Sequence, residues 1–216
     1  MANTISPPLL RDRFPSLERS TYLVSHSMGA APAAARDALD RYMDEWVADG
    51  PEAWVRWLPR IGEIADGIGA LIGAAPGSTF LGPNVSVLQA ALATAIDFRG
   101  ERNEVLYEAL QFPSLTYVWR EWERYGARTQ IVPSDDGRTI PTDRICAAIT
   151  ERTALAVISH AYYVSGALAD IAAIQVRCRE VGALLCVDAY QTTGIVPYDV
   201  RALDLDIAAC PGCATT

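Results

Sequence analysis

An aspartate follows a strongly apolar run in the C-terminal third of the sequence. Asp188 comes directly after Ala183 to Val187 and is followed by Tyr190 and Gln191. A carboxylate at the end of a buried strand is costly to leave unpaired, so we expect it to have a partner. One suitable partner is the protonated nitrogen of a pyridine ring, which makes the ring an electron sink. A metal, a ribose, an arginine or a turn cap are the alternatives.

A second candidate segment suits an anion. Gly82 to Ser86 follows the apolar run Thr79 to Leu81 and precedes a helical pattern. Free amides at a helix start attract phosphate, which makes Val85 and Ser86 candidate ligands. The simpler interpretation is that Asn84 only caps the helix. The predicted helix carries Leu88, Ala91, Leu92 and Ala95 on one face.

Two further segments follow apolar runs. Phe112 stands before Pro113, where its ring could cover a flat ligand or simply pack. Ser159 to Gly166 is rich in hydroxyls and contains His160, one of only 2 histidines. A hydrolase triad of Ser27, His160 and Asp188 is conceivable, but the sequence has no G-x-S-x-G motif. The nucleotide-binding glycine motifs are also missing.

Composition narrows the functional classes. The net charge is −8 and no basic cluster exists, so we expect no nucleic-acid partner. Apolar runs are too short to cross a bilayer, and the N-terminus lacks a signal-peptide pattern, so a cytoplasmic protein is expected. The 5 cysteines are an odd number and stand in apolar surroundings, which argues against a disulfide framework. Cys210 and Cys213 have the spacing of a redox or metal pair, but no second pair accompanies them.

The hydrophobic pattern of the sequence changes near residue 75. Residues 1–75 predict a helical segment with a break at Gly50-Pro51, and residues 76–216 alternate apolar runs with helices. Such alternation predicts an α/β fold with a mainly parallel sheet and helices on both faces. Ligands bind such sheets outside the carboxyl ends of the strands, where the candidate residues stand. The expected strands are Thr79 to Leu81, Glu104 to Tyr107, Thr129 to Val132, Leu155 to Ser159, Leu184 to Val187 and Ile207 to Ala209.

The order of these segments resembles class V aminotransferases and kynureninases, fold-type-I enzymes that use pyridoxal 5'-phosphate (PLP). The likeness spans roughly residues 20–210 and rests on Tyr22-Leu23 with Ser27-Met28-Gly29, Pro83-Asn84-Val85-Ser86, Phe112-Pro113-Ser114, Ser159-His160 through Ser165-Gly166, and Val187-Asp188-Ala189-Tyr190-Gln191. It implies an incomplete PLP-binding large domain in residues 76–216.

The resemblance also implies roles for single residues. Asp188 would pair with the pyridine nitrogen, Gln191 would lie near the ring hydroxyl or phosphate, and Phe112 would stack on the ring. The remaining cofactor-binding residues that it implies are Val85, Ser86, Ser114 and Ser159. Two departures weaken kynurenine as the substrate: Leu115 stands where kynureninases usually have Asp, and Ser25-His26-Ser27-Met28-Gly29 replaces their usual G-N-S-L-G.

All 18 basic residues are arginines, so the chain has no lysine. The family holds PLP through a Schiff-base lysine. Leu205 to Cys210 resembles the strand that leads to this lysine, but Pro211 to Thr216 follows instead. The resemblance therefore implies an N-terminal part of an enzyme, truncated before the lysine and not catalytically competent by itself.

The parent enzyme would be a homodimer that acts on an amino-acid substrate by transamination, desulfuration or Cβ–Cγ hydrolysis. The sequence does not distinguish these reactions. Two alternatives stay open: a catalytically dead homologue that serves as a binding or interaction module, and a truncated gene product without a role of its own.

Overall fold

A computed structural model describes residues 10–211 and 213–215, which fall into two compact units divided between Arg60 and Ile61. The first contains the turn η1 (Pro15–Glu18), helix α2 (Ala34–Asp49), the turn η2 (Gly50–Ala53) and the start of α3 (Trp54–Ala70). Helix α2 ends at Gly50, which has a φ of 53° and donates its amide to the carbonyl of Trp46. The predicted break at Gly50-Pro51 is confirmed.

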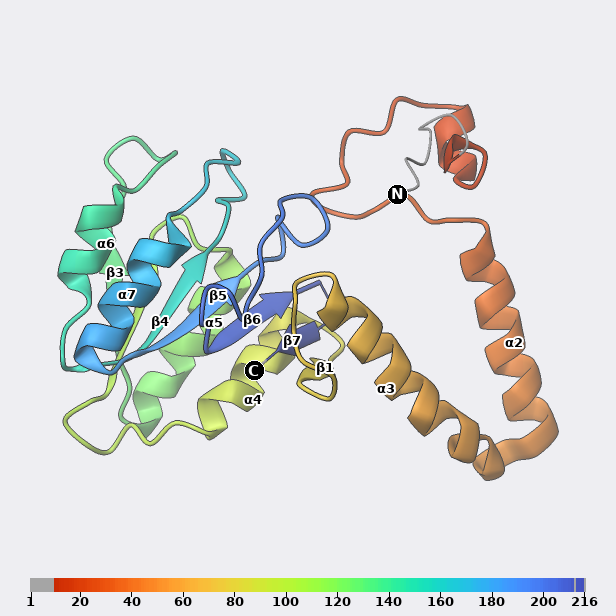
Figure 1. The fold of residues 1–216 in the computed structure, drawn as a ribbon, viewed down its shortest axis with the longest axis horizontal. Coiled ribbons are helices and arrows are strands. Elements are labelled where there is room, and N and C mark those ends of the chain that lie inside the picture. The colour runs from red at the N-terminus through yellow and green to blue at the C-terminus, as the bar shows by residue number, and fades with distance from the viewer. Residues whose placement is uncertain (1–9, 212, 216) are drawn as a thin grey trace. The chain divides into compact units, whose positions relative to one another are not determined.

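The second unit is built on a seven-stranded sheet (Figure 1). Its strands lie in the order β1-β7-β6-β5-β4-β2-β3. All six expected strands are present, and the sheet adds one short strand that the sequence did not predict, β7. The strand bounds are β1 Thr79–Leu81, β2 Glu104–Glu108, β3 Arg128–Val132, β4 Thr153–Ser159, β5 Leu184–Asp188, β6 Ile207–Cys210 and β7 Cys213–Thr215.

The sheet is mainly parallel, as expected. Strands β6, β5, β4, β2 and β3 are parallel neighbours, while β7 pairs antiparallel with both β6 and β1. Because β7 runs antiparallel to both of its neighbours, β1 points the same way as the five parallel strands. The carboxyl ends of these six strands therefore meet at one edge of the sheet, which we call the carboxyl edge.

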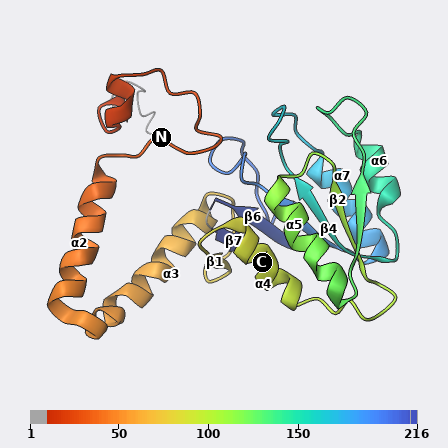
Figure 2. The ribbon, with the colours of Figure 1, turned by 180° about the vertical axis from the view of Figure 1, so that it is seen from behind.

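Helices cover both faces of the sheet, which confirms the predicted fold class. Helices α6 (Thr142–Ala148) and α7 (Ile171–Val181) lie on the face toward the viewer in Figure 1. Helices α4 (Val85–Thr94) and α5 (Pro113–Glu121), with the turn η3 (Trp122–Tyr125), lie on the opposite face in Figure 2. No helix in residues 10–211 is long and apolar enough to cross a membrane.

Alternate residues of the strands fill the two cores. Leu106 and Ile158 pack with the α6–α7 side, whereas Val105 and Val157 pack with the α4–α5 side. This two-residue period follows from the strand pleat, which turns successive side chains to opposite faces. Trp119 on α5 is fully buried and anchors the second core.

The predicted apolar face of α4 is only partly buried, since Leu88 and Leu92 are half-buried. Gln89 and Ala93 are its buried residues, while Ala91 and Ala95 are exposed. The helix turns Gln89 inward because its amide Nε2 donates to the Cys186 Sγ at 3.1 Å. A polar residue with a buried partner thus occupies a position that hydrophobic periodicity assigns to the surface.

Candidate functional site

Three neighbouring strands end in polar residues at the carboxyl edge. Strand β2 ends at Glu108, β4 at Ser159 and β5 at Asp188, and the last two are register partners. Their side chains are buried, with exposed fractions of 0%, 4% and 7%. The Ser159 amide donates to Glu108 Oε1 at 2.8 Å. The sequence predicted Ser159 and Asp188 as site residues, but Glu108 was missed.

Asp188 is a buried carboxylate that forms no ion pair within the described residues. Its Oδ1 accepts the Tyr190 amide at 3.0 Å, and no arginine in the described part of the chain forms an ion pair with it. Burial raises the pKa of Asp188 to about 6, and the hydrogen bond from Tyr190 opposes this rise. A folded protein tolerates such a group best when a positively charged ligand compensates for the lost water.

Glu108 is a second buried carboxyl group at the same edge. Its Oε1 accepts the Ser159 amide, but its Oε2 is buried and has no hydrogen-bond partner in the described residues. Burial raises the pKa of Glu108 to about 7, and the Asp188 charge adds a smaller rise. The carboxyl edge therefore has two buried acids, and burial disfavours the charged form of each.

A hydrogen-bond network joins β4 to the loop after β2. Gln111 Oε1 accepts the Ser159 hydroxyl at 3.0 Å and the Phe112 amide at 2.9 Å, while its Nε2 donates to the Val157 carbonyl. Phe112 is held by its backbone, and its ring stays 47% exposed. Ser114 lies in the first turn of α5, half-buried behind Pro113.

The Phe112 ring has an aromatic neighbour from the loop after β4. The ring of Tyr163 meets it edge to face, with centroids 5.3 Å apart and an interplanar angle of 80°. Since Phe112 is exposed, its ring can cover a flat ligand beside Tyr163. The sequence did not single out Tyr163, because nothing in its spacing marks it.

His160 is fixed by structural contacts. Its amide donates to the Asp188 carbonyl at 2.8 Å, its Nδ1 lies 2.9 Å from the Thr192 hydroxyl, and its ring meets Tyr198 edge to face. Burial lowers the pKa of His160, so the neutral ring is favoured. The imidazole bonds Thr192 and not the Asp188 carboxylate, which removes the histidine–aspartate contact that a hydrolase triad needs.

The start of α4 faces the same edge. Asn84 Oδ1 accepts the Val87 amide at 3.0 Å, which confirms the predicted cap, and Val85 and Ser86 form the first turn. The bond from Gln89 to Cys186 ties this helix to β5, two residues before Asp188. Gln191 is half-buried in the turn that follows β5.

The Cys210–Cys213 segment contains residue 212, which lies outside the described residues, and the pair stays a hypothesis. Cys210 is buried at the end of β6. Among the described residues, no group of three or more His, Cys, Asp or Glu side chains could hold a metal ion.

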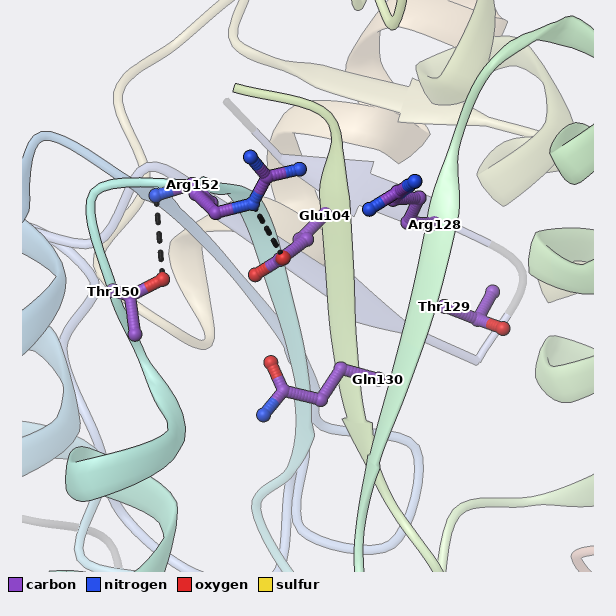
Figure 3. Close-up of a pocket in the computed structure, with 6 residues that line it drawn as sticks. All are labelled: Glu104, Arg128, Thr129, Gln130, Thr150 and Arg152. Atoms are coloured by element: carbon purple, nitrogen blue, oxygen red, sulfur yellow. Dashed lines mark hydrogen bonds and ion pairs between the residues drawn. The ribbon is translucent and has the colours of Figure 1, made fainter. Parts of the chain in front are cut away.

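A separate hollow lies at the opposite, amino-terminal edge of the sheet (Figure 3). It has a volume of about 450 Å³ and includes Glu104, Arg128 and Arg152 in its lining. Arg152 Nε donates to Glu104 Oε1 at 2.9 Å, so the ion pair already neutralises one of its arginines. This hollow is distinct from the polar strand ends of the carboxyl edge.

Residues 67–213 match the sequence profile of the family described as aminotransferase class V. The chain belongs to the class V aminotransferase family. Members of this family bind PLP, and a PLP-bearing structure is among those that share the fold. The resemblance drawn from the sequence motifs is thereby confirmed.

Two curated relatives of this class V chain illustrate the family. It is 30% identical over 203 residues to the uncharacterized aminotransferase YcbU of Bacillus subtilis (strain 168), covering 94% of this chain and 54% of the relative. It is 28% identical over 208 residues to the kynureninase of Geobacillus thermodenitrificans (strain NG80-2), covering 92% and 49%. The chain thus spans about half the length of the curated relatives it matches.

Solved structures share the fold of this class V chain. The apo cysteine desulfurase of Thermococcus onnurineus NA1 superposes with a TM-score of 0.81 at 17% identity, over 99% of this chain and 57% of that one. A C-DES variant with glycine covalently linked to its PLP cofactor gives a TM-score of 0.80 at 19% identity, over 95% and 58%. The α/β unit therefore matches the large domain of PLP enzymes.

Proposed function

We propose that this chain provides the cofactor-binding half of a PLP-dependent enzyme that acts on an amino acid. The observation that carries the proposal is the Asp188 carboxylate, buried at the carboxyl edge without a cationic partner among the described residues. A protonated pyridine nitrogen would supply the missing positive charge. Bound PLP supplies an electron sink for a carbanion on the amino acid.

Each remaining site residue has a proposed role that its position allows. Phe112 offers an exposed ring to cover the cofactor, and the Gln111–Ser159 network fixes its backbone. The first-turn amides of Val85 and Ser86 would bind the phosphate. Ser114, Ser159 and Gln191 would provide polar contacts to the ring substituents or phosphate.

The 216 residues contain no lysine, so we infer that these residues hold the cofactor without a covalent bond. The reaction of the whole protein, be it transamination, desulfuration or Cβ–Cγ hydrolysis, is proposed only by analogy with relatives, as is a homodimeric assembly.

A reduction experiment separates covalent from non-covalent attachment. Borohydride treatment of the chain with PLP should leave no pyridoxyl adduct on any residue after Met1, because no side-chain amine is present. Mass spectrometry of the intact protein and its peptides measures this. An adduct on an internal residue would contradict the proposed mode of attachment.

The role of Asp188 is tested by binding PLP to the purified chain in equilibrium dialysis. Asp188→Asn keeps the side-chain shape but removes the charge, and should weaken binding by roughly 10- to 100-fold through loss of a charge-assisted hydrogen bond. Glu151→Gln is the matched control, because Glu151 is exposed in the turn before β4 at the opposite edge.

A PLP analogue with carbon in place of the ring nitrogen sharpens the test. The wild-type chain should prefer PLP to the analogue, and Asp188→Asn should lose this preference. Equal affinity of the wild-type chain for both compounds would refute the proposed pairing, and no saturable binding of PLP would refute the proposed function.

A further inference from the structure

A buried glutamine joins helix α4 to the strand that carries Asp188. Gln89 lies on α4 and Cys186 on β5, and both side chains are buried. The Gln89 Nε2 donates to the Cys186 Sγ at 3.1 Å. Within the described residues, Gln89 is the one side chain of α4 that forms a hydrogen bond to the sheet. The bond therefore holds the helix to the sheet at a defined point.

The polar atoms of Gln89 are poorly satisfied at this position. Burial raises the pKa of Cys186 to about 12, so the acceptor is a neutral thiol, which accepts hydrogen bonds only weakly. The Gln89 Oε1 is buried and has no hydrogen-bond partner in the described residues. An apolar side chain of the same length would therefore cost less to bury. What the amide adds is direction, because a hydrogen bond restricts the geometry of its two partners.

The bond sets the level of the helix start relative to the end of the strand. Cys186 packs on the α4–α5 side of the sheet, and Asp188 faces the same side because the strand pleat has a period of two. Along β5, Asp188 lies roughly 6.6 Å beyond Cys186 toward the carboxyl edge. Along α4, Ser86 lies roughly 4.5 Å from Gln89 toward the same edge, because the helix begins there. The first-turn amides and the Asp188 carboxylate are thus held at nearly the same level over one face of the sheet.

We propose that Gln89 is a positioning residue, whose bond to Cys186 holds the start of α4 at the spacing from Asp188 that one PLP molecule needs to reach both. The inference rests on the proposed function, in which the phosphate meets the first-turn amides and the ring nitrogen meets Asp188. A rigid ligand that is held at two ends gains affinity from the second end only when the spacing fits. Loss of the bond should therefore weaken the contribution of the phosphate to binding more than that of the ring.

The experiment compares PLP with pyridoxal, which has the same ring but no phosphate, by equilibrium dialysis against the purified chain. Gln89→Met keeps the length of the side chain but has no donor, and should weaken PLP binding by roughly 10-fold. Its affinity for pyridoxal should match that of wild type, so the ratio of the two affinities should fall. General damage to the fold would instead weaken the binding of both compounds alike.

Gln175→Met is the matched control. Gln175 is also a buried helical glutamine, but it lies on α7, over the other face of the sheet, and its Nε2 donates to the Asp204 carbonyl at 2.6 Å. Loss of this bond should lower the free energy of unfolding in urea yet leave the ratio of PLP to pyridoxal affinity unchanged.

Substitutions of Cys186 test the acceptor. Cys186→Ser keeps an acceptor and should keep the wild-type ratio, whereas Cys186→Ala should lower the ratio as Gln89→Met does. The double variant of Gln89→Met with Cys186→Ala should lower it no further, because both changes break the same bond. An unchanged ratio in both single variants, or losses that add in the double variant, would overturn the inference.

Hydrogen exchange keeps this inference distinguishable from the proposed function. If the wild-type chain binds neither compound, the proposed function fails, and the Val87 amide, which is bonded to the Asn84 cap, still reports on the helix start. Its exchange should be faster in Gln89→Met than in wild type and unchanged in Gln175→Met. Equal exchange in all three chains would refute the role of Gln89. Tight PLP binding with an unchanged ratio in Gln89→Met would also refute that role and leave the proposed function standing.

Discussion

Buried acids make the stability of the folded chain depend on pH in an unusual direction. Burial raises the pKa of Glu108 to about 7 and that of Asp188 to about 6, whereas both ionise near pH 4 in an unfolded chain. Between these values the folded state holds protons that the unfolded state has released. The stabilising contribution is therefore complete below about pH 4 and is lost as the pH rises through 6 and 7.

Glu108→Gln should flatten this pH dependence. We expect the wild-type free energy of unfolding to lose on the order of 3 kcal/mol from Glu108 between pH 4.5 and 7.5, and the variant to lose much less. Urea unfolding followed by circular dichroism at several pH values measures the difference. The exposed control Glu151→Gln should keep the wild-type slope. A variant with the same slope as wild type would show that Glu108 is not a buried acid.

Asp188 and Glu108 also show which buried acids can be predicted from their place in the sequence and which cannot. Asp188 was identifiable because a carboxylate directly follows an apolar run. Glu108 occupies the same kind of position after Tyr107, but its strand begins with another acid, Glu104, which is paired at the surface. The sequence does not say which end of a strand is buried under neighbouring loops. Only the packed sheet distinguishes the two glutamates.

At the scale of elements, the contribution of the α4 cap to stability can be measured separately from its contribution to PLP binding. Asn84→Ala should lower the free energy of unfolding by about 1 kcal/mol, because the Val87 amide loses its acceptor. It should also weaken PLP binding, since the first-turn amides that would meet the phosphate become less ordered. Urea unfolding and equilibrium dialysis measure the two effects.

Asp170→Ala is the matched control for this cap. Asp170 caps α7 by accepting the Ala173 amide at 3.0 Å, so its loss should cost a similar free energy of unfolding. It should leave the affinity for PLP unchanged. Equal affinities of the Asn84 and Asp170 variants would argue against a phosphate site at α4.

Six strands and four helices of the second unit followed from apolar runs and helical periodicity. Strand β7 did not, because Cys213–Thr215 shows no apolar run and is defined only by its pairing with β1 and β6. The most buried positions of α4 were also missed, because one of them is a glutamine, Gln89, that is turned inward. Both errors come from tertiary contacts that overrule local pattern.

At the scale of the whole molecule, large apolar side chains are exposed on α2 and α3. Leu39, Met43 and Trp46 on α2 and Val55 and Leu58 on α3 are all exposed. Clustered apolar surface of this kind usually marks an interaction face. We expect the purified chain to self-associate, in keeping with the proposed homodimer.

Sedimentation velocity at several concentrations tests this expectation. Leu39→Gln combined with Trp46→Gln should shift the chain toward the monomer, because the association would lose apolar contact area. Val176→Gln, at an exposed valine on α7, should not. A wild-type chain that stays monomeric at all concentrations would contradict the expectation.

The pairing of β1 with β7 also determines the order in which the strands of the sheet can pair during synthesis. Thr79 pairs with Thr215, so β1 leaves the ribosome long before its hydrogen-bonded neighbour exists. Strands β2, β3, β4 and β5 pair with one another and can assemble during that interval. The helix start at Val85, which immediately follows β1, would acquire its fixed place last. A nascent chain stalled before β7 should therefore contain folded β2–β5 yet lack an ordered start of α4, where we propose that the phosphate binds.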